Sequence, residues 1–178
     1  TNRNELKERD LGYYVGYRIC EEYYKKAKDK KKAVQQMIEL DYNNDSTVEA
    51  FFDASGFFQQ PLNVIYDAYE KSRPIITSIQ PFENGSKTVK PGKTLITVHF
   101  SKPLNSHNTG IDFGPLGEEY CPRISIDKRV WAEDGKAWTF EADLQPNKRY
   151  QILISNNFRM QDGTRLKPHL IDITTAAQ

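Results

Sequence analysis

The feature that most constrains this chain is the position of its prolines. Of nine prolines only Pro61 precedes Pro74, and glycine follows the same trend, with three residues before Pro74 and seven after it. Proline interrupts a helix because it lacks an N–H and its ring collides with the preceding turn, whereas strand ends and turns accept it. The first part of the chain can therefore be helical, and the second is punctuated like a β-fold. We predict an α+β multidomain protein with a helical subdomain over 1–73 and an all-β domain over 74–178.

Charge does not follow this division. Lys and Arg together number 25 and Asp and Glu 24, so the net charge is only +1. Such a balance gives no overall field that would attract nucleic acid or an anionic membrane. No apolar run approaches the roughly 20 residues that span a bilayer. We therefore expect no nucleic-acid partner and no transmembrane segment.

Hydrophobic periodicity predicts four short helices before Pro74. Asp29 is placed to cap the second helix, over 30–40. Residues 46–49, Ser-Thr-Val-Glu, form a capping box for the third helix, which Gly56 can end in the left-handed conformation. The fourth helix begins at Pro61, a favoured first residue, and stops at Pro74. The first helix has its apolar face on four residues at helical spacing, Leu11, Val15, Ile19 and Tyr23.

Two glycines, Gly12 and Gly16, lie four residues apart in this first helix. Each costs up to about 1 kcal/mol relative to alanine. With Tyr13 and Tyr17 they make a flat strip on which another backbone can approach closely. One explanation is a tight helix crossing within this chain. The other is a face that packs on structure upstream of Thr1, which we favour because short helices alone make a thin core.

Residues 8–58 resemble a known family through two segments, "LGYYVGYRICEEYYKKAKDKKKAVQQMIEL" and "VEAFFDASGF". They are similar to the C-terminal end of predicted zinc-dependent proteases that carry an HExxH helix. In that family a Gly-Tyr-x-x-Gly helix follows the catalytic helix, and a Ser-Gly-aromatic ending comes later. The matching positions here are Gly12, Tyr13, Gly16 and the segment 55–57. The resemblance implies that Tyr13 lies near the cleft of a longer parent protein, although structural packing of its ring is favoured.

The resemblance does not extend to catalysis in this chain. Zinc hydrolysis needs two histidines one helical turn apart, a third ligand and a carboxylate that activates water. The helical part has no histidine, and His99, His107 and His169 lie in the second part at unsuitable spacings. We expect no catalytic residue, no metal ligand and no cofactor in this chain. Zinc belongs only to a longer parent, which would be a metallopeptidase.

The second domain shows the alternation of half-buried strands. In "TLITVHF" three apolar residues, Ile96, Val98 and Phe100, share one face. Similar runs recur near 75–80, 122–131, 137–142, 149–155 and 170–175, a spacing typical of a β-sandwich. The predicted core comprises Val98, Phe100, Ile126, Val130, Trp138, Phe140, Tyr150 and Ile152.

One hairpin allows a choice of register. A two-residue loop, Asp134-Gly135, would set Trp131 opposite Trp138 but leave several aliphatic residues on the face away from Phe140. A three-residue loop over 133–135, with Gly135 left-handed, pairs Val130 with Trp138 and Ile126 with Ala142. We predict the second register. Trp131 then faces outward, or the strand carries a bulge.

Residues 74–176 resemble the bacterial Ig-like domains of S-layer and other envelope proteins. The matching segments, in order, are "PIITSIQPFENG", "ITVHFSKPLN", "WAEDGKAWTF", "LQPNKRYQILIS" and "DGTRLK". The resemblance implies an immunoglobulin-like sandwich that acts as a spacer or interaction module without catalysis. Tyr150 stands where a strand begins after a Pro-Asn turn, which makes it a candidate corner tyrosine whose phenol bonds to upstream backbone.

Few residues outside these patterns suggest a site. Cys20 and Cys121 either pair or stay free, and two free thiols are favoured. Exposed aromatics, with Trp131 the main candidate beside Phe82 and Tyr120, would suit contact with a sugar or a protein, although core and edge packing is the default.

These observations predict the non-catalytic C-terminal region of a secreted or envelope-anchored bacterial protein. Its expected location is extracytoplasmic. The alternative is a stand-alone binding or adhesion module at the cell surface, for protein or carbohydrate. If the chain is such a C-terminal region, its expected partner is a missing upstream domain. If it is a stand-alone module, its expected partner is a cell-surface protein or carbohydrate.

Overall fold

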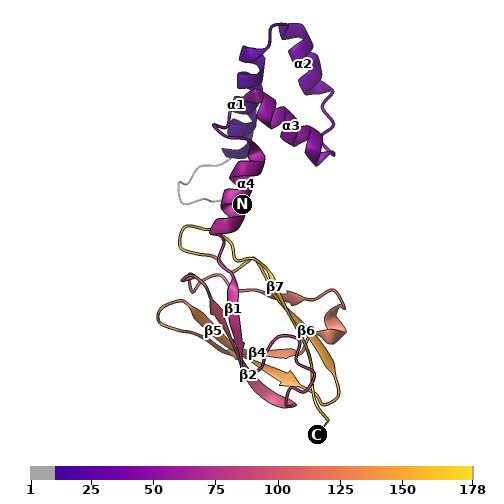
Figure 1. Cartoon of the computed structure of the whole chain (residues 1–178), viewed down its shortest axis with the longest axis vertical. Coiled ribbons are helices and arrows are strands. Elements are labelled where there is room, and N and C mark those ends of the chain that lie inside the picture. Colours follow the sequence, from indigo (N-terminus) through magenta and orange to yellow (C-terminus); the bar gives the residue numbers. More distant parts are fainter. Residues whose placement is uncertain (1–10, 178) are drawn as a thin grey trace. The chain divides into compact units, whose positions relative to one another are not determined.

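The computed structural model describes residues 11–177 and divides the chain into two compact units, Thr1–Lys71 and Ser72–Gln178. The first unit is helical, and the second is built of antiparallel strands (Figure 1). Each unit is held together by contacts within itself. None of the described helices is both long and apolar enough to cross a membrane.

The helical unit contains α1 (Leu11–Lys26), α2 (Lys30–Ile38), α3 (Asp45–Ser55) and α4 (Leu62–Ser72). The predicted N-cap of α2 is confirmed, since the Asp29 side chain accepts a hydrogen bond from the backbone N–H of Lys32 at 3.0 Å. The predicted left-handed end of α3 is also confirmed, with Gly56 at φ 60°.

Two helix starts differ from the prediction. The N-cap of α3 is Asn44, whose side chain accepts from the N–H of Thr47, and not Ser46. Asparagine caps at least as well as serine, so the helix begins at the earlier of two competent residues. Helix α4 begins at Leu62, whose N–H donates to the carboxylate of Asp53 at 2.9 Å. Pro61 precedes the helix, and its carbonyl accepts hydrogen bonds from the N–H groups of Val64 and Ile65.

The helical unit has a small apolar core. Helix α1 packs on α2 and α3, where the rings of Tyr23 and Phe51 lie 4.7 Å apart. Four hydrophobic residues of the described part are buried, namely Ile19, Ala33, Phe51 and Leu62. The removal of apolar area from water is the dominant favourable term in folding, and four buried side chains remove little of it. The core of the helical unit therefore stabilises its fold only weakly.

The β unit forms two antiparallel sheets. The first has the order β1 (Ile76–Gln80), β2 (Gly92–Phe100), β5 (Ala137–Leu144) and β4 (Arg123–Trp131). The second has the order β3 (Ile111–Phe113), β6 (Arg149–Ile154) and β7 (His169–Thr174), and a short 3₁₀ helix, Glu118–Tyr120, precedes β4. Strand β3 has three residues and was not predicted.

One hydrophobic core joins the two sheets. Alternate residues of β2 and β5 face it, with Val98 paired with Trp138 and Ile96 with Phe140. The second sheet supplies Tyr150, Ile152, Ile154, Ile171 and Ile173, and the loop between β6 and β7 adds Phe158 and Leu166. Six of the eight predicted core residues are buried here.

The other two, Ile126 and Val130, are exposed at 75% and 64%, so the predicted register of β4 is wrong. Trp131 pairs with Trp138 and Val130 with Thr139, but Ser125 pairs with Glu141. Residues 126–129 of β4 therefore stand against Phe140 alone, as an extended bulge. In the structure Trp131 and Ile124 both face the core.

The charges of β4 give a physical reason for this bulge. The predicted register would have set Lys128 opposite Phe140 on the core face. A regular strand continuing from the Trp131–Trp138 pair would have placed Arg129 and Asp127 there. An unpaired buried charge is too costly for either arrangement. The bulge sends all three charges outward and leaves Ile126 and Val130 exposed with them.

Tyr150 bonds to upstream backbone, as predicted. Its ring is buried in the core, and its phenol oxygen accepts a hydrogen bond from the N–H of Gln145 at 2.8 Å. The bond links the start of β6 to the end of β5 across a turn in which Asn147 has φ 54°. A tyrosine at such a corner ties two consecutive strands of a sandwich together.

Substitutions in the first sheet test the register of β4. Replacing Ile126 with alanine should change the free energy of unfolding by no more than about 0.5 kcal/mol, because the side chain is already in solvent. Replacing Ile96, which is fully buried, should cost about 2–5 kcal/mol. Urea denaturation followed by tryptophan fluorescence measures both. A comparable loss at Ile126 would show that β4 pairs without the bulge.

A second substitution tests the corner tyrosine. Tyr150→Phe keeps the packed ring but leaves the N–H of Gln145 without its acceptor, and should cost about 1–3 kcal/mol in the free energy of unfolding. Tyr13→Phe, at an exposed phenol with no hydrogen bond among the described residues, is the control. Equal stability of the two variants would mean that the corner hydrogen bond contributes nothing.

Candidate functional site

Helix α1 carries two strongly exposed aromatic residues. Tyr13 is 82% exposed and Tyr17 62%, and they stand one helical turn apart. Ile19, which is buried, and Tyr23, which packs on Phe51, point roughly 120° around the helix from the two tyrosines, on the side that also carries Gly12 and Gly16. The amphipathic pattern therefore fixes which face is covered and leaves the tyrosines outside. We call Gly12, Tyr13, Gly16 and Tyr17 the α1 face.

The two glycines of the α1 face meet no neighbour. A Cβ placed on Gly12 or on Gly16 would have no atom within 4 Å. Within the described part of the chain, the glycines therefore do not serve a tight helix crossing, which was one of the two explanations. The other explanation, packing on structure outside these residues, stays a prediction, as does a cleft-facing role for Tyr13.

Trp131 lies at the edge of the core of the β unit. Its ring is half-buried, with centroids 5.8 Å from the rings of both Phe100 and Phe158 and 6.4 Å from Trp138. It also lines a shallow hollow of about 260 Å³ with Asn105, His107 and other loop residues. Packing thus accounts for much of the ring, and its predicted contact with a sugar or protein stays a prediction.

Metal and thiol chemistry find little support in the described residues. Among residues 11–177, no three His, Cys, Asp or Glu side chains cluster in a way that would hold a metal ion. The expectation that the chain holds no zinc remains a prediction for metal analysis. Cys20 and Cys121 are free thiols. Burial and the nearby Glu118 carboxylate raise the pKa of Cys121, which makes it a poorer nucleophile.

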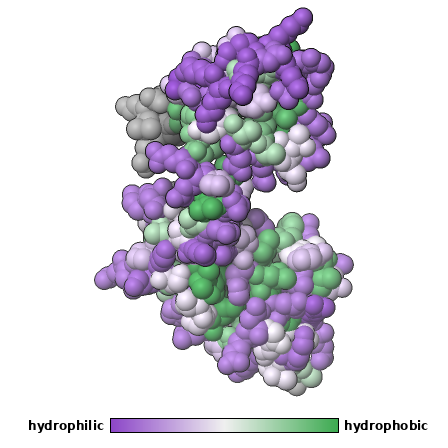
Figure 2. Space-filling model, turned by 45° about the horizontal axis from the view of Figure 1, so that its top comes forward, coloured by the Kyte–Doolittle hydropathy of each residue, from purple (hydrophilic) through white to green (hydrophobic). Residues whose placement is uncertain are grey.

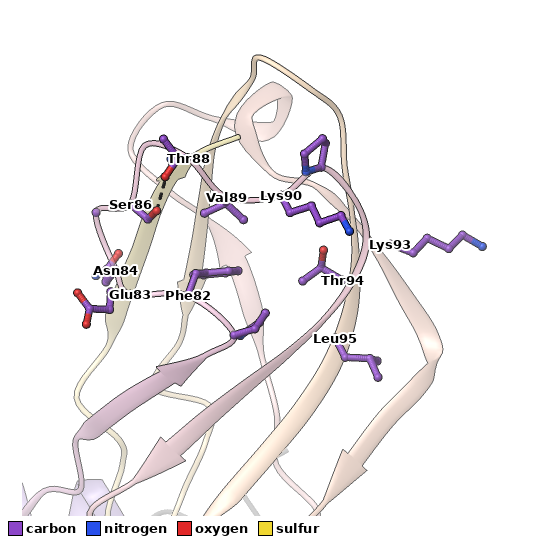
Figure 3. Close-up of a pocket in the computed structure, with 13 residues that line it drawn as sticks. Phe82, Glu83, Asn84, Ser86, Thr88, Val89, Lys90, Lys93, Thr94 and Leu95 are labelled. Carbon is purple, nitrogen blue, oxygen red and sulfur yellow. Dashed lines mark hydrogen bonds between the residues drawn. The ribbon is translucent and has the colours of Figure 1, made fainter. Parts of the chain in front are cut away.

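The clearest concave site lies in the β unit, between the loop 81–91 and the start of β2. This hollow has a volume of about 910 Å³, which falls within the usual range of about 300–1,000 Å³ for ligand pockets. We call it the loop pocket (Figure 3). Sequence analysis named only one of its residues, Phe82, and did not predict a cavity there.

The lining of the loop pocket combines apolar and polar groups. Phe82 is half-buried and packs against the core, and Leu95 lines another part of the hollow with its side chain exposed. The close-up shows Lys90 extending along the hollow, whereas Lys93 and Glu83 point away from it (Figure 3). Hydroxyl groups complete the lining, contributed by Ser86, Thr88 and Thr94.

The loop pocket is held in place by the edge of the second sheet. The Asn84 side chain accepts from the N–H of Asp172 at 2.8 Å and donates to the carbonyl of Leu170 at 2.8 Å, as a neighbouring strand would. Further along, the N–H of Val89 donates to the carbonyl of Thr174 at 3.1 Å. The loop thus protects the edge of β7, which would otherwise be free to pair with another chain.

A charge pair joins β7 to its neighbour β6. Arg149 and the buried Gln151 both donate to the Asp172 carboxylate, and Arg149 does so through two nitrogens, at 2.9 and 2.6 Å. These hydrogen bonds, chiefly those from Arg149, lower the pKa of Asp172 to about 2. Beside Asn84, burial lowers the pKa of His169 and so favours its neutral form.

No protein-family model and no curated protein matches the chain. Among solved structures it is similar to the S-layer protein rSbsC, with a TM-score of 0.40 and 18% identity over 96% of this chain. The chain spans 23% of that protein. It is also similar to PcoC, a methionine-rich copper resistance protein from Escherichia coli, with a TM-score of 0.43 and 17% identity over 58% of this chain and 99% of that one.

At these TM-scores neither similarity establishes the fold or the activity of this chain. Neither structure is named as a zinc protease, so the relation predicted for residues 8–58 stays a prediction. Its first three residues, 8–10, lie outside the described part of the chain.

The pKa of Asp172 predicts how acid affects stability. Because the folded pKa, about 2, lies below the ordinary value of 3.8, the interaction stabilises fully above that ordinary value and is lost as pH falls toward 2. Asp172→Asn should therefore be less stable than the unsubstituted chain at pH values well above the ordinary pKa, with a difference that shrinks in acid. Chemical denaturation over a pH series measures this, and Arg149→Gln should behave similarly. A stability difference between Asp172→Asn and the unsubstituted chain that does not change with pH would contradict the lowered pKa of Asp172.

Proposed function

We propose that this chain is a non-catalytic interaction module of an extracytoplasmic protein. In this proposal the β unit is an Ig-like spacer, and the helical unit joins it to a protein partner through the α1 face. The observation that carries the proposal is the α1 face, where two glycines and two exposed tyrosines stand together and no atom of residues 11–177 lies near a Cβ placed on either glycine.

The β unit supports the role of spacer. Sixteen hydrophobic residues from its two sheets and their loops are buried in one core, so the unit can hold its own fold. Two antiparallel sheets over a shared core and a corner tyrosine are features of Ig-like sandwiches. An Ig-like spacer and an extracytoplasmic location also follow from the segments that resemble envelope domains.

The helical unit supports the role of interaction surface. Its four buried hydrophobic residues contrast with the large hydrophobic residues that it exposes. Seven of these lie on α1 and α2, namely Leu11, Tyr13, Tyr14, Tyr17, Tyr24, Val34 and Ile38. Apolar groups at the surface are visible on both units (Figure 2). Contiguous exposed apolar surface often marks a place where another protein binds, and tyrosine is enriched in such interfaces.

The partner in this proposal is a domain of a longer parent protein. The segments that resemble zinc-dependent proteases support a metallopeptidase parent, whose catalytic half would cover the α1 face. The rival proposal is a stand-alone adhesion module, in which the helices act only as a cap. Only the first gives the two glycines a role, because a cap needs no close approach of a second backbone.

A substitution at Gly16 tests this proposal. In this chain Gly16→Leu should leave the free energy of unfolding unchanged or raise it by up to about 1 kcal/mol, because the site is open and leucine favours helix. In the longer parent of this proposal the same change should cost about 1–3 kcal/mol by overpacking. Lys31→Leu, which also places a leucine on an exposed helix surface, is the control in both. A neutral effect of Gly16→Leu in both proteins would contradict the proposal.

A further inference from the structure

We infer that the loop pocket binds an acidic saccharide, with a sugar ring against Phe82 and a carboxylate or sulfate group at Lys90. This inference goes beyond the proposed function, which concerns the α1 face of the other unit. Neither depends on the other, so either can fail alone.

The walls of the loop pocket are formed before any ligand arrives. Asn84, Gly85 and Ser86 form backbone or side-chain hydrogen bonds with β7, and Val89 is buried in the core and bonded to Thr174 and Ala176. Both limbs of the loop are thereby fixed to the sheet. A preorganised site binds more tightly because little conformational entropy is lost on binding.

The charge around the loop pocket selects an anionic ligand. The segment 81–95 contains three lysines, Lys87, Lys90 and Lys93, and one acidic residue, Glu83. Within the described residues, the side-chain ammonium groups of Lys90 and Lys93 have no hydrogen-bond or ion-pair partner. Glu83 points away from the hollow, whereas Lys90 extends along it (Figure 3). An ammonium group that the fold does not use can form a charge-assisted hydrogen bond with a carboxylate or sulfate oxygen.

The remaining lining selects a saccharide among anionic ligands. Phe82 and Leu95 provide an apolar surface suited to the C–H face of a sugar ring. The hydroxyl groups of Thr88 and Thr94 lie around it and can hydrogen-bond with sugar hydroxyls. A volume of about 910 Å³ accommodates more than one sugar ring. A simple inorganic anion would use neither the apolar surface nor this volume.

Isothermal titration calorimetry with the full chain tests the inference. The probes are trigalacturonic acid, the neutral trisaccharide maltotriose, sodium sulfate and the acidic tripeptide triglutamate. We expect binding of trigalacturonic acid, no binding of maltotriose, and weaker binding as salt concentration rises, because salt screens exposed charges. Lys90→Gln should lower the affinity about ten-fold, as expected for the loss of one charge-assisted contact. Lys128→Gln, which removes an exposed lysine from β4, should leave the affinity unchanged.

Each other outcome overturns the inference. Equal binding of maltotriose would show that charge does not select the ligand. Sulfate binding as tightly as the saccharide would show an adventitious ion only. Binding of triglutamate but not trigalacturonic acid, with the same loss in Lys90→Gln, would identify an acidic protein segment as the ligand. Equal losses in Lys90→Gln and Lys128→Gln would place the saccharide elsewhere, and no binding of any probe would mean that the hollow has no ligand of this class.

Discussion

The apolar core shared by the two sheets is the interaction on which the β unit depends. It fixes the face of every strand, because a side chain that points the wrong way either leaves the core or brings a charge into it. The irregular pairing of β4 follows from this constraint. Trp131 and Ile124 can both reach the core only if the strand bulges between them, and the bulge keeps Asp127, Lys128 and Arg129 in solvent. The loop over the edge of β7 depends on the same core through Val89, which is buried in it.

The helical unit is organised differently. Good local signals define its helices, including the caps at Asp29 and Asn44 and the left-handed Gly56. Gly56 also makes room for Lys26, whose ammonium group would lie only 1.7 Å from a Cβ at that position. Few of its apolar side chains are buried, however. In our account the units therefore have different tasks, since one is stable by its own core and the other presents a surface.

Local sequence patterns predicted much of this fold. Alternation located β2 and β5 and their core residues, and turn chemistry identified Tyr150 as a corner residue. The patterns failed where non-local energies decide. The register of β4 depended on the burial of three charges, which an argument from the aliphatic residues alone did not weigh. The three-residue strand β3 is too short to show a period.

The candidate sites were predictable to a smaller degree. The α1 face was visible in the sequence as two glycines and two tyrosines at helical spacing. The loop pocket was not, because its walls exist only when Asn84 and Val89 pair with β7, which lies more than eighty residues further along the chain. One local signal was available, since three lysines stand near Phe82 between the strand ends.

Equilibrium unfolding of the whole chain with two probes tests the central claim most directly. Both tryptophans, Trp131 and Trp138, lie in the β unit, so their fluorescence reports on its core, whereas far-UV circular dichroism reports mainly on the four helices. If the β unit is stable by itself and the helical unit lacks its partner, the helical signal should be lost at clearly lower denaturant concentration than the fluorescence signal. Coincident transitions would show one cooperative structure and would contradict the division of tasks between the two units.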